Sequence, residues 1–149
     1  MKKEVKILYS PGYGAGWYTT NTQYPDCLRD SEIIALVEQM DKLLEESEYD
    51  VRDIEKYEYY SAVSSKEIPD CFGYLLTDEF ASFLKLYNDI VQEIERLANK
   101  KWPKGYWSTG AIRQLTIAVM EEGQAFKLKD YDGSESIEYI YTDSSLLIA

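Results

Sequence analysis

Residues 125–141, AFKLKDYDGSESIEYIY, contain two alternating segments separated by an Asp-Gly pair. Apolar and polar side chains alternate over 125–129 and again over 135–141, and this period of two is typical of half-buried strands. Asp132-Gly133, between the segments, is a dipeptide that favours the two-residue turn of a β-hairpin. The sequence therefore predicts an antiparallel hairpin, and with it a mostly antiparallel sheet.

Three further strands are expected upstream of the hairpin. Residues 4–10 (EVKILYS) and 115–119 (LTIAV) have alternating or apolar patterns that favour strands. The segment 54–63, which contains YEYY at 57–60, is ambiguous. Tyrosine prefers strand positions, so we expect a short strand there.

The first of two predicted helices covers 31–46. Its apolar residues recur at the three- and four-residue spacing of a single helix face. Asp30 or Ser31 is suited to the N-cap, and Glu32 places a negative charge in the first turn, where the helix dipole favours it.

The second predicted helix is longer and covers 78–100. Thr77 or Asp78 is suited to cap it, its apolar residues again share one face, and Pro103 stops it. Lysines near its end lie where the helix dipole favours cations. Together with the hairpin, the two helices predict an α+β fold in which both helices pack on one face of a mostly antiparallel sheet.

Length and charge limit the classes of function. The chain has 149 residues, which fits a single domain over 1–149. Its formal net charge is −11 and its pI is near 4.5. Such a charge repels nucleic-acid phosphates and anionic lipid, so we expect no direct nucleic-acid binding and no membrane binding. In a sharper alternative, the carboxylates mimic nucleic acid in the phosphate-binding groove of a partner protein.

The residue types exclude several chemistries. The chain has no histidine and two cysteines, Cys27 and Cys71, so a Ser-His-Asp triad, a Cys-His pair and histidine-ligated zinc are ruled out. Asp130, Asp132 and Glu135 superficially resemble a calcium loop but lack its full ligand spacing, and a plain turn is expected instead. We predict no cofactor, no metal site and no catalytic residue, and hence a binding protein rather than an enzyme.

A glycine- and aromatic-rich loop, GYGAGWY over 12–18, follows the first predicted strand. In a structural interpretation, its glycines serve a tight turn or a close approach of two backbones. In a functional interpretation, free backbone N–H groups bind an anion while the aromatic rings stack on the ligand. The loop matches neither the dinucleotide-binding pattern nor the P-loop.

A second loop of similar chemistry, WPKGYWSTG over 102–110, is followed by Arg113, whose guanidinium suits two-point contact with phosphate or carboxylate. If the two loops lie together, they would wall one pocket for a planar, anionic ligand. In the alternative, the tryptophans close the core. The predicted ligand-binding residues are Tyr9, Gly12, Tyr13, Gly14, Gly16, Trp17, Tyr106, Trp107 and Arg113.

Two stretches resemble small uncharacterised accessory proteins of tailed bacteriophages and prophages: the opening YSPGYGAGW over 9–17 and the closing EGQAFKLKDYDGSESIE over 122–138. The resemblance implies a phage origin and expression in the host cytoplasm, and it supplies no activity. Small accessory phage proteins commonly antagonise host machinery, including immune systems. We expect no signal peptide. This expectation and the two separated cysteines agree with a reducing compartment.

Two functions are therefore predicted. The first is antagonism of host defence by sequestering a small anionic, nucleotide-like signalling ligand between the two loops. The alternative is inhibition of a host nuclease or nucleic-acid-binding protein through the acidic surface. The expected partner is thus a small ligand or a host protein, and the sequence also allows a homo-oligomer.

Overall fold

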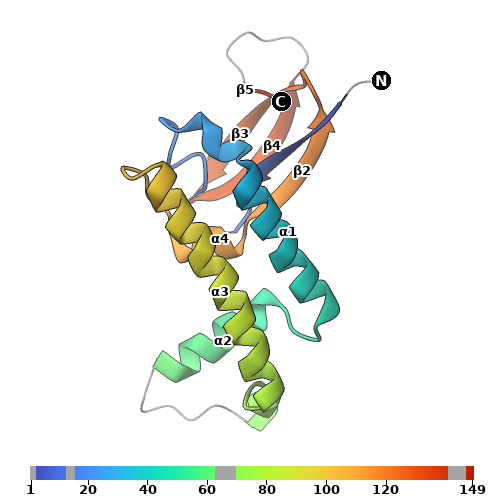
Figure 1. Ribbon diagram of the computed structural model, residues 1–149, viewed down its shortest axis with the longest axis vertical. Coiled ribbons are helices and arrows are strands. Elements are labelled where there is room, and N and C mark those ends of the chain that lie inside the picture. The colour runs from blue at the N-terminus through green and yellow to red at the C-terminus, as the bar shows by residue number, and fades with distance from the viewer. Residues whose placement is uncertain (1–2, 13–15, 63–69, 141–146) are drawn as a thin grey trace.

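The computed structural model describes residues 3–12, 16–62, 70–140 and 147–149 (Figure 1). The strands in this part of the chain are β1 (Glu4–Tyr9), β2 (Thr116–Glu121), β3 (Ala125–Tyr131), β4 (Ser134–Ile140) and β5 (Leu147–Ile148). The α-helices are α1 (Ser31–Glu46), α2 (Val51–Ala62), α3 (Asp78–Lys101) and α4 (Thr109–Arg113), and short 3₁₀ turns cover Pro25–Leu28 and Asp70–Leu75. The fold is α+β, as the sequence predicts.

The strands form two antiparallel sheets. β1 pairs with β2, so that Tyr9 lies opposite Thr116, and β3 lies between β4 and β5. The turn between β3 and β4 has φ angles of 52° at Asp132 and 84° at Gly133, both in the left-handed region that a two-residue hairpin turn of this kind requires. The predicted hairpin is confirmed.

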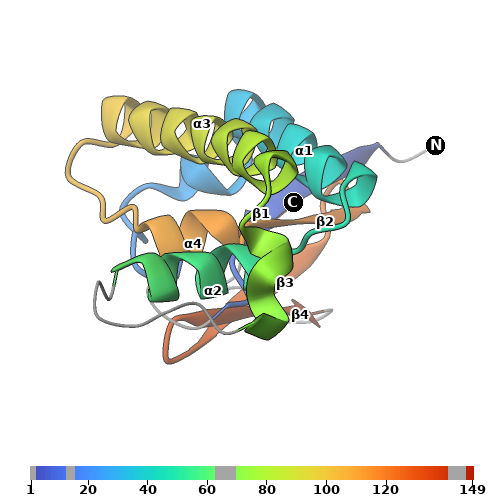
Figure 2. The same ribbon diagram turned by 90° about the horizontal axis from the view of Figure 1, so that it is seen from below.

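The two long helices form one layer of the molecule. In Figure 2, α1 and α3 lie side by side, with β3 and β4 on the opposite side of the protein. Both predicted helices are confirmed. Asp30 caps α1 by accepting the Ile33 N–H at 3.0 Å, and Thr77 caps α3 by accepting the Phe80 N–H at 3.1 Å. Each cap satisfies a backbone donor that the first helical turn leaves without a partner.

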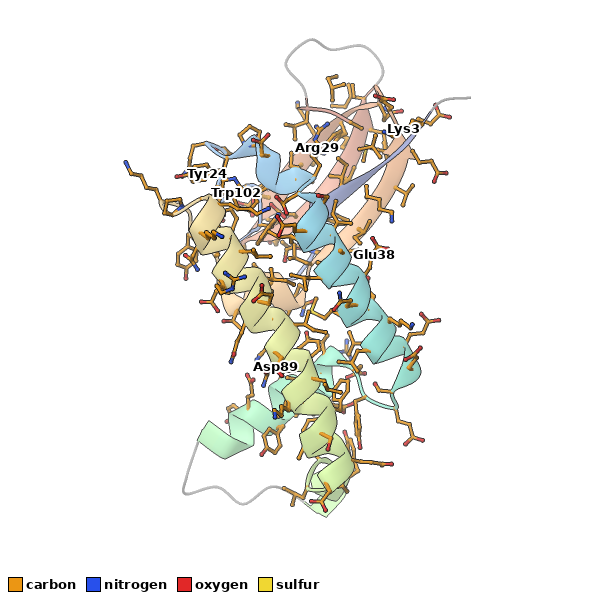
Figure 3. The ribbon with its side chains drawn as sticks, viewed as in Figure 1. Lys3, Tyr24, Arg29, Glu38, Asp89 and Trp102 are labelled. Carbon is orange, nitrogen blue, oxygen red and sulfur yellow. The ribbon has the colours of Figure 1, made fainter. Side chains whose placement is uncertain are left out.

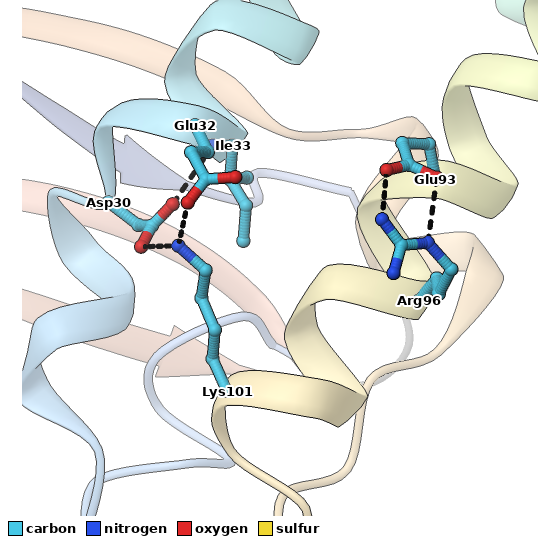
Figure 4. Close-up of polar contacts among 6 residues, drawn as sticks. All are labelled: Asp30, Glu32, Ile33, Glu93, Arg96 and Lys101. Atoms are coloured by element: carbon cyan, nitrogen blue, oxygen red, sulfur yellow. Dashed lines mark hydrogen bonds and ion pairs between the residues drawn. The ribbon is translucent and has the colours of Figure 1, made fainter.

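One lysine ties the end of α3 to the start of α1. Lys101 Nζ lies 2.6 Å from Asp30 Oδ2 and 2.9 Å from Glu32 Oε1 (Figure 4). The hydrogen bond to Asp30 raises the pKa of Lys101. The cation lies at the negative end of one helix dipole and the carboxylates at the positive end of the other, so both dipoles favour this contact. The pair between Arg96 and Glu93, also shown in Figure 4, stays within α3.

The strand predicted within 54–63 is wrong, because helix α2 occupies this part of the chain. Two reciprocal hydrogen bonds begin the helix: the Asp53 N–H donates to Asp50 Oδ1 at 3.0 Å, and the Asp50 N–H donates to Asp53 Oδ2 at 2.9 Å. Ile54 and Tyr57 are three residues apart and share a helix face, whereas a strand would point them to opposite sides. Ile54 is fully buried, and the Tyr57 ring packs against an aromatic ring of α3 at 5.2 Å. Burial of Ile54 and ring packing of Tyr57 on the same face therefore favour the helix.

The loop predicted over 102–110 is shorter than expected, because α4 begins at Thr109. Ser108 Oγ caps this helix by accepting the Ala111 N–H at 3.1 Å. Arg113 is the last residue of this short helix, and the helical backbone therefore sets the direction in which its side chain projects.

Candidate functional site

The segments on either side of the first glycine-rich loop meet at a buried carboxylate of the protein itself. Glu135 has 1% of its surface exposed. Its Oε1 accepts the Ser10 N–H at 2.7 Å, and its Oε2 accepts the N–H groups of Tyr18 at 2.8 Å and Thr19 at 2.7 Å. The Tyr18 N–H at the end of the loop and the flanking N–H groups of Ser10 and Thr19 therefore converge on an anion, and this anion is a side chain of β4.

Gly16 makes this arrangement sterically feasible. A Cβ atom at this position would lie 3.0 Å from Glu135 Oε2 and 2.1 Å from Thr19 Oγ1. Any larger residue would have to displace the Thr19 hydroxyl and would press against the Glu135 carboxylate. The glycine thus has a structural role, although it makes room for two side chains and not for a second backbone.

The tryptophans of both loops meet inside the core. Trp17 is fully buried, and its ring centroid lies 4.6 Å from that of Trp107, which packs in turn against Trp102 at 5.3 Å. Trp102 lies at the end of α3 (Figure 3). The indole N–H groups are also occupied: that of Trp17 donates to the Cys27 carbonyl at 2.8 Å, and that of Trp107 to the Trp102 carbonyl at 3.0 Å. The rings therefore hold the loops together and expose almost no surface for stacking.

A buried asparagine clips the two loops to each other. Asn21 Nδ2 donates to the Trp17 carbonyl at 2.7 Å and to the Tyr106 carbonyl at 3.0 Å, and Asn21 Oδ1 accepts the Tyr106 N–H at 2.6 Å. The sequence does not reveal this residue, because an asparagine among other polar residues gives no sign that it is buried. The Tyr106 ring itself points outward and is 61% exposed.

Arg113 is paired within the fold. Its Nη1 donates to Glu58 Oε2 at 2.7 Å and its Nη2 donates to Glu58 Oε1, so the guanidinium meets both oxygens of the carboxylate. The Arg113 side chain is 13% exposed, whereas that of Glu58 is 42% exposed. The two-point contact predicted for a ligand is thus made by a residue of α2. Within the described residues, Arg113 Nε and the hydroxyl of the fully buried Tyr87 have no hydrogen-bond partner.

A hollow of about 640 Å³ lies next to the first loop and is lined by Gly12, Asp50, Val51, Arg52, Glu55 and Gln114. Gly12 is the predicted site residue that lines it, and a Cβ there would lie 2.3 Å from Gln114 Cγ. Two carboxylates face one guanidinium in this lining, so its charge does not favour an anion. Tyr9 lies half-buried in β1, and Tyr13 and Gly14 fall outside the described residues. The assignment of the nine residues to a ligand site remains a prediction.

Two kinds of site are absent from the part of the chain that the structure describes. No helix there is long and apolar enough to cross a bilayer. No group of three or more carboxylate or cysteine side chains there is placed to hold a metal ion. Instead, Asp130 Oδ1 accepts the Gly133 N–H at 2.6 Å inside the hairpin turn. The Cys27 thiol is buried, and this burial raises its pKa well above the ordinary value, which disfavours the nucleophilic thiolate.

Exposed carboxylates gather where the end of α1 approaches the first half of α3. Several of them make no ion pair or side-chain hydrogen bond within the described residues: Glu45, Glu48, Asp78, Glu79 and Asp89. Nearby on α1, partial burial raises the pKa of Asp41, and the negative charge of Glu38 raises it further. This end of the molecule therefore carries an excess of negative charge that the protein does not neutralise itself.

Comparisons of the chain with models of known protein families, with curated proteins and with solved structures found no match. The resemblance of 9–17 and 122–138 to phage accessory proteins therefore remains a prediction.

Proposed function

We propose that this chain is a non-enzymatic accessory protein that antagonises a host protein by binding it through a carboxylate-rich surface. The observation that carries the proposal is the group of exposed, unpaired carboxylates beside α1 and α3, which includes Glu48, Glu79 and Asp89. A basic partner surface would relieve their mutual repulsion and would be steered toward them over several ångströms. Nucleases and nucleic-acid-binding proteins have such surfaces, because they must bind phosphates.

Sequestration of a nucleotide-like ligand has less support from the same geometry. Such a site needs free ring faces, free donors and a free cation. Trp17 and Trp107 are buried against each other. The Tyr18 N–H of the first loop meets Glu135, and Arg113 is paired with Glu58. A ligand would have to displace these internal partners, and each buried polar group left unpaired costs about 1–3 kcal/mol.

Affinity capture from bacterial extract tests the proposed function. We expect the protein to retain a basic host protein at low ionic strength and to release it as salt screens the contact. The purified partner should then lose its nuclease or nucleic-acid-binding activity when this protein is added. The informative variant is Glu79→Lys combined with Asp89→Lys. Its matched control, Glu4→Lys with Glu122→Lys, makes the same change in net charge at exposed positions on β1 and after β2.

Three results would contradict the proposal. Capture and inhibition that are equal in both double variants would remove the role of this surface. Failure of the wild-type protein to capture any host protein would contradict the proposal that it binds one. Release of a nucleotide from the denatured protein would favour the ligand hypothesis instead.

A further inference from the structure

An apolar groove runs along the solvent side of the α1–α3 layer. Two hollows, of about 460 Å³ and about 360 Å³, lie along it and share Leu43, Glu46 and Leu86. Leu86 lies where the hollows meet and is 55% exposed, although most large apolar residues of the two helices are buried. We call this feature, defined by the lining of the two hollows, the α1–α3 groove.

The lining of the α1–α3 groove is partly apolar and partly acidic. It includes the apolar side chains of Leu43, Phe83, Leu86 and Ile90. Its carboxylates, which we call the rim, are those of Glu46, Glu48, Glu79 and Asp89. Figure 3 shows Asp89 midway along α3. Among the described residues, one lysine lines the groove, and its Nζ (Lys42) lies 3.9 Å from Glu46 Oε1. The groove therefore combines exposed apolar surface with a negative border.

The dimensions of the groove match a short helix. On α3 its lining runs from Glu79 through Phe83 and Leu86 to Ile90, a stripe of steps of four, three and four residues along one helix face. At about 1.5 Å per residue, this stripe is roughly 16 Å long, which is about three helical turns. A space between two packed helices accepts the side-chain ridge of a third helix. Strand addition, by contrast, needs an open sheet edge.

We propose that the α1–α3 groove binds an amphipathic helix of about three turns from the partner protein, with apolar side chains on its inner face and Lys or Arg along both flanks. The inference rests on the proposed function, because it names the segment by which the host protein is held. Apolar contact with Leu43, Leu86 and Ile90 would give affinity, and the rim carboxylates would select a basic helix over an acidic one. A second copy of this chain fits poorly, since its net charge of −11 would repel the rim.

A synthetic peptide tests the inference directly. The probe is a labelled peptide of leucine and lysine in which the leucines recur at helical spacing. Two controls are a peptide of the same composition with leucines at every second position, and the helical peptide with glutamate in place of lysine. Binding is followed by fluorescence anisotropy, and the contact surface by chemical-shift changes in a ¹⁵N-labelled sample. Of the three peptides, we expect only the helical Leu/Lys peptide to bind. The largest chemical-shift changes should lie around Leu43, Leu86 and Ile90.

Protein variants locate the binding surface. Leu86→Asp adds negative charge, which by itself would strengthen attraction to the peptide, so weaker binding reports the loss of apolar contact. We expect its affinity to fall about tenfold or more, because a buried leucine contributes about that much to binding. The matched control is Tyr131→Asp, on the far hairpin at a side chain that is 74% exposed. It should bind as the wild type does.

The outcomes separate this inference from the proposed function. Equal binding of the helical and alternating peptides, or wild-type affinity in Leu86→Asp, would overturn the groove as a helix site. If Leu86→Asp still captured the host protein that the wild type captures, the proposed function would stand without the groove. Binding of the glutamate peptide, or concentration-dependent dimerisation that Leu86→Asp abolishes, would show that a different occupant uses the groove and would also overturn the inference.

Discussion

Glu135 and Ser10 hold the start of β4 to the end of β1 through a pair of hydrogen bonds. The Ser10 N–H donates to Glu135 Oε1 at 2.7 Å, and the Glu135 N–H donates to the Ser10 carbonyl at 2.8 Å. These residues are 125 positions apart in the chain. Their contact brings together the strands that carry the opening and closing segments.

Replacing Glu135 by glutamine should destabilise the fold. The carboxylate accepts three backbone N–H groups, whereas a glutamine side chain has one acceptor oxygen and would turn its own N–H₂ toward at least one of them. We expect Glu135→Gln to lose about 2–3 kcal/mol of unfolding free energy, measured by urea denaturation. Glu138→Gln, on the exposed side of the same strand, should melt near the wild type. Equal urea midpoints for the two variants would contradict this account of the loop.

Truncating Trp17 should unfold the protein rather than empty a binding site. The ring is fully buried between Trp102 and Trp107. We expect Trp17→Ala to lower the unfolding free energy by about 3–5 kcal/mol. Tyr106→Ala removes a mostly exposed ring of the second loop and should change stability little. If instead Trp17→Ala kept wild-type stability and lost binding of a nucleotide, the result would support the stacking pocket predicted from the sequence.

The Arg113–Glu58 pair should show measurable coupling. Arg113→Ala leaves the carboxylate without its two-point partner, and we expect a loss of about 1–2 kcal/mol, because one side of the pair is solvated. The double variant with Glu58→Ala should lose less than the sum of the two single variants, as a double-mutant cycle by thermal denaturation would report. Arg113→Lys should not restore full stability, because lysine cannot meet both oxygens at once. Full additivity would show that the pair contributes nothing.

Removing the buried hydroxyl of Tyr87 should be harmless or stabilising. Within the described residues this hydroxyl has no hydrogen-bond partner, and burial raises its pKa. Tyr87→Phe keeps the ring and should raise the unfolding free energy by up to about 1 kcal/mol, or leave it unchanged. A differential scanning calorimetry trace with a clearly lower Tm would reveal that the hydroxyl has a partner in solution.

Stability should fall in alkaline solution because of Cys27. Burial raises the pKa of its thiol, and the nearby charges of Glu135 and Asp26 raise it further. A raised pKa in the folded state means that the thiol of the unfolded chain ionises first. Its stabilising contribution is therefore complete below about pH 8.5 and declines above it, by up to about 1.4 kcal/mol per pH unit.

The measurement needs a background without the second thiol. In Cys71→Ser, urea denaturation at about pH 8 and about pH 10 should show this decline. With Cys27→Ser added, the pH dependence should be flatter, although the variant is less stable throughout. Identical slopes in both proteins would show that Cys27 does not titrate differently on folding. As an independent check, native Cys27 should react slowly with a thiol-alkylating reagent and rapidly in urea.

The sequence by itself determined the features that depend on neighbouring residues. The Asp132-Gly133 turn, the caps at Asp30 and Thr77 and the apolar faces of α1 and α3 all follow from contacts within a few positions. In the same way, the excess of carboxylates can be counted without a structure. The spacing of Ile54 and Tyr57 also fits the helix α2, but the strand preference of the neighbouring tyrosines points the other way.

Only the tertiary structure decided which partner each chemical group would have. Glu135 occupies a polar position beside a turn, where a carboxylate usually meets water; the one local sign of burial is that it shares a strand face with the half-buried Ile137. Trp17 and Trp107, likewise, would suit a stacking site or a core equally well by residue type. Long-range packing brought the glycine loop onto Glu135, the rings onto each other and Arg113 onto Glu58. Burial and pairing are set by contacts between distant segments. An unpaired buried group destabilises the folded protein, so each such group needs a partner, but the partner can come from any segment. Such pairing therefore leaves no periodicity in the sequence.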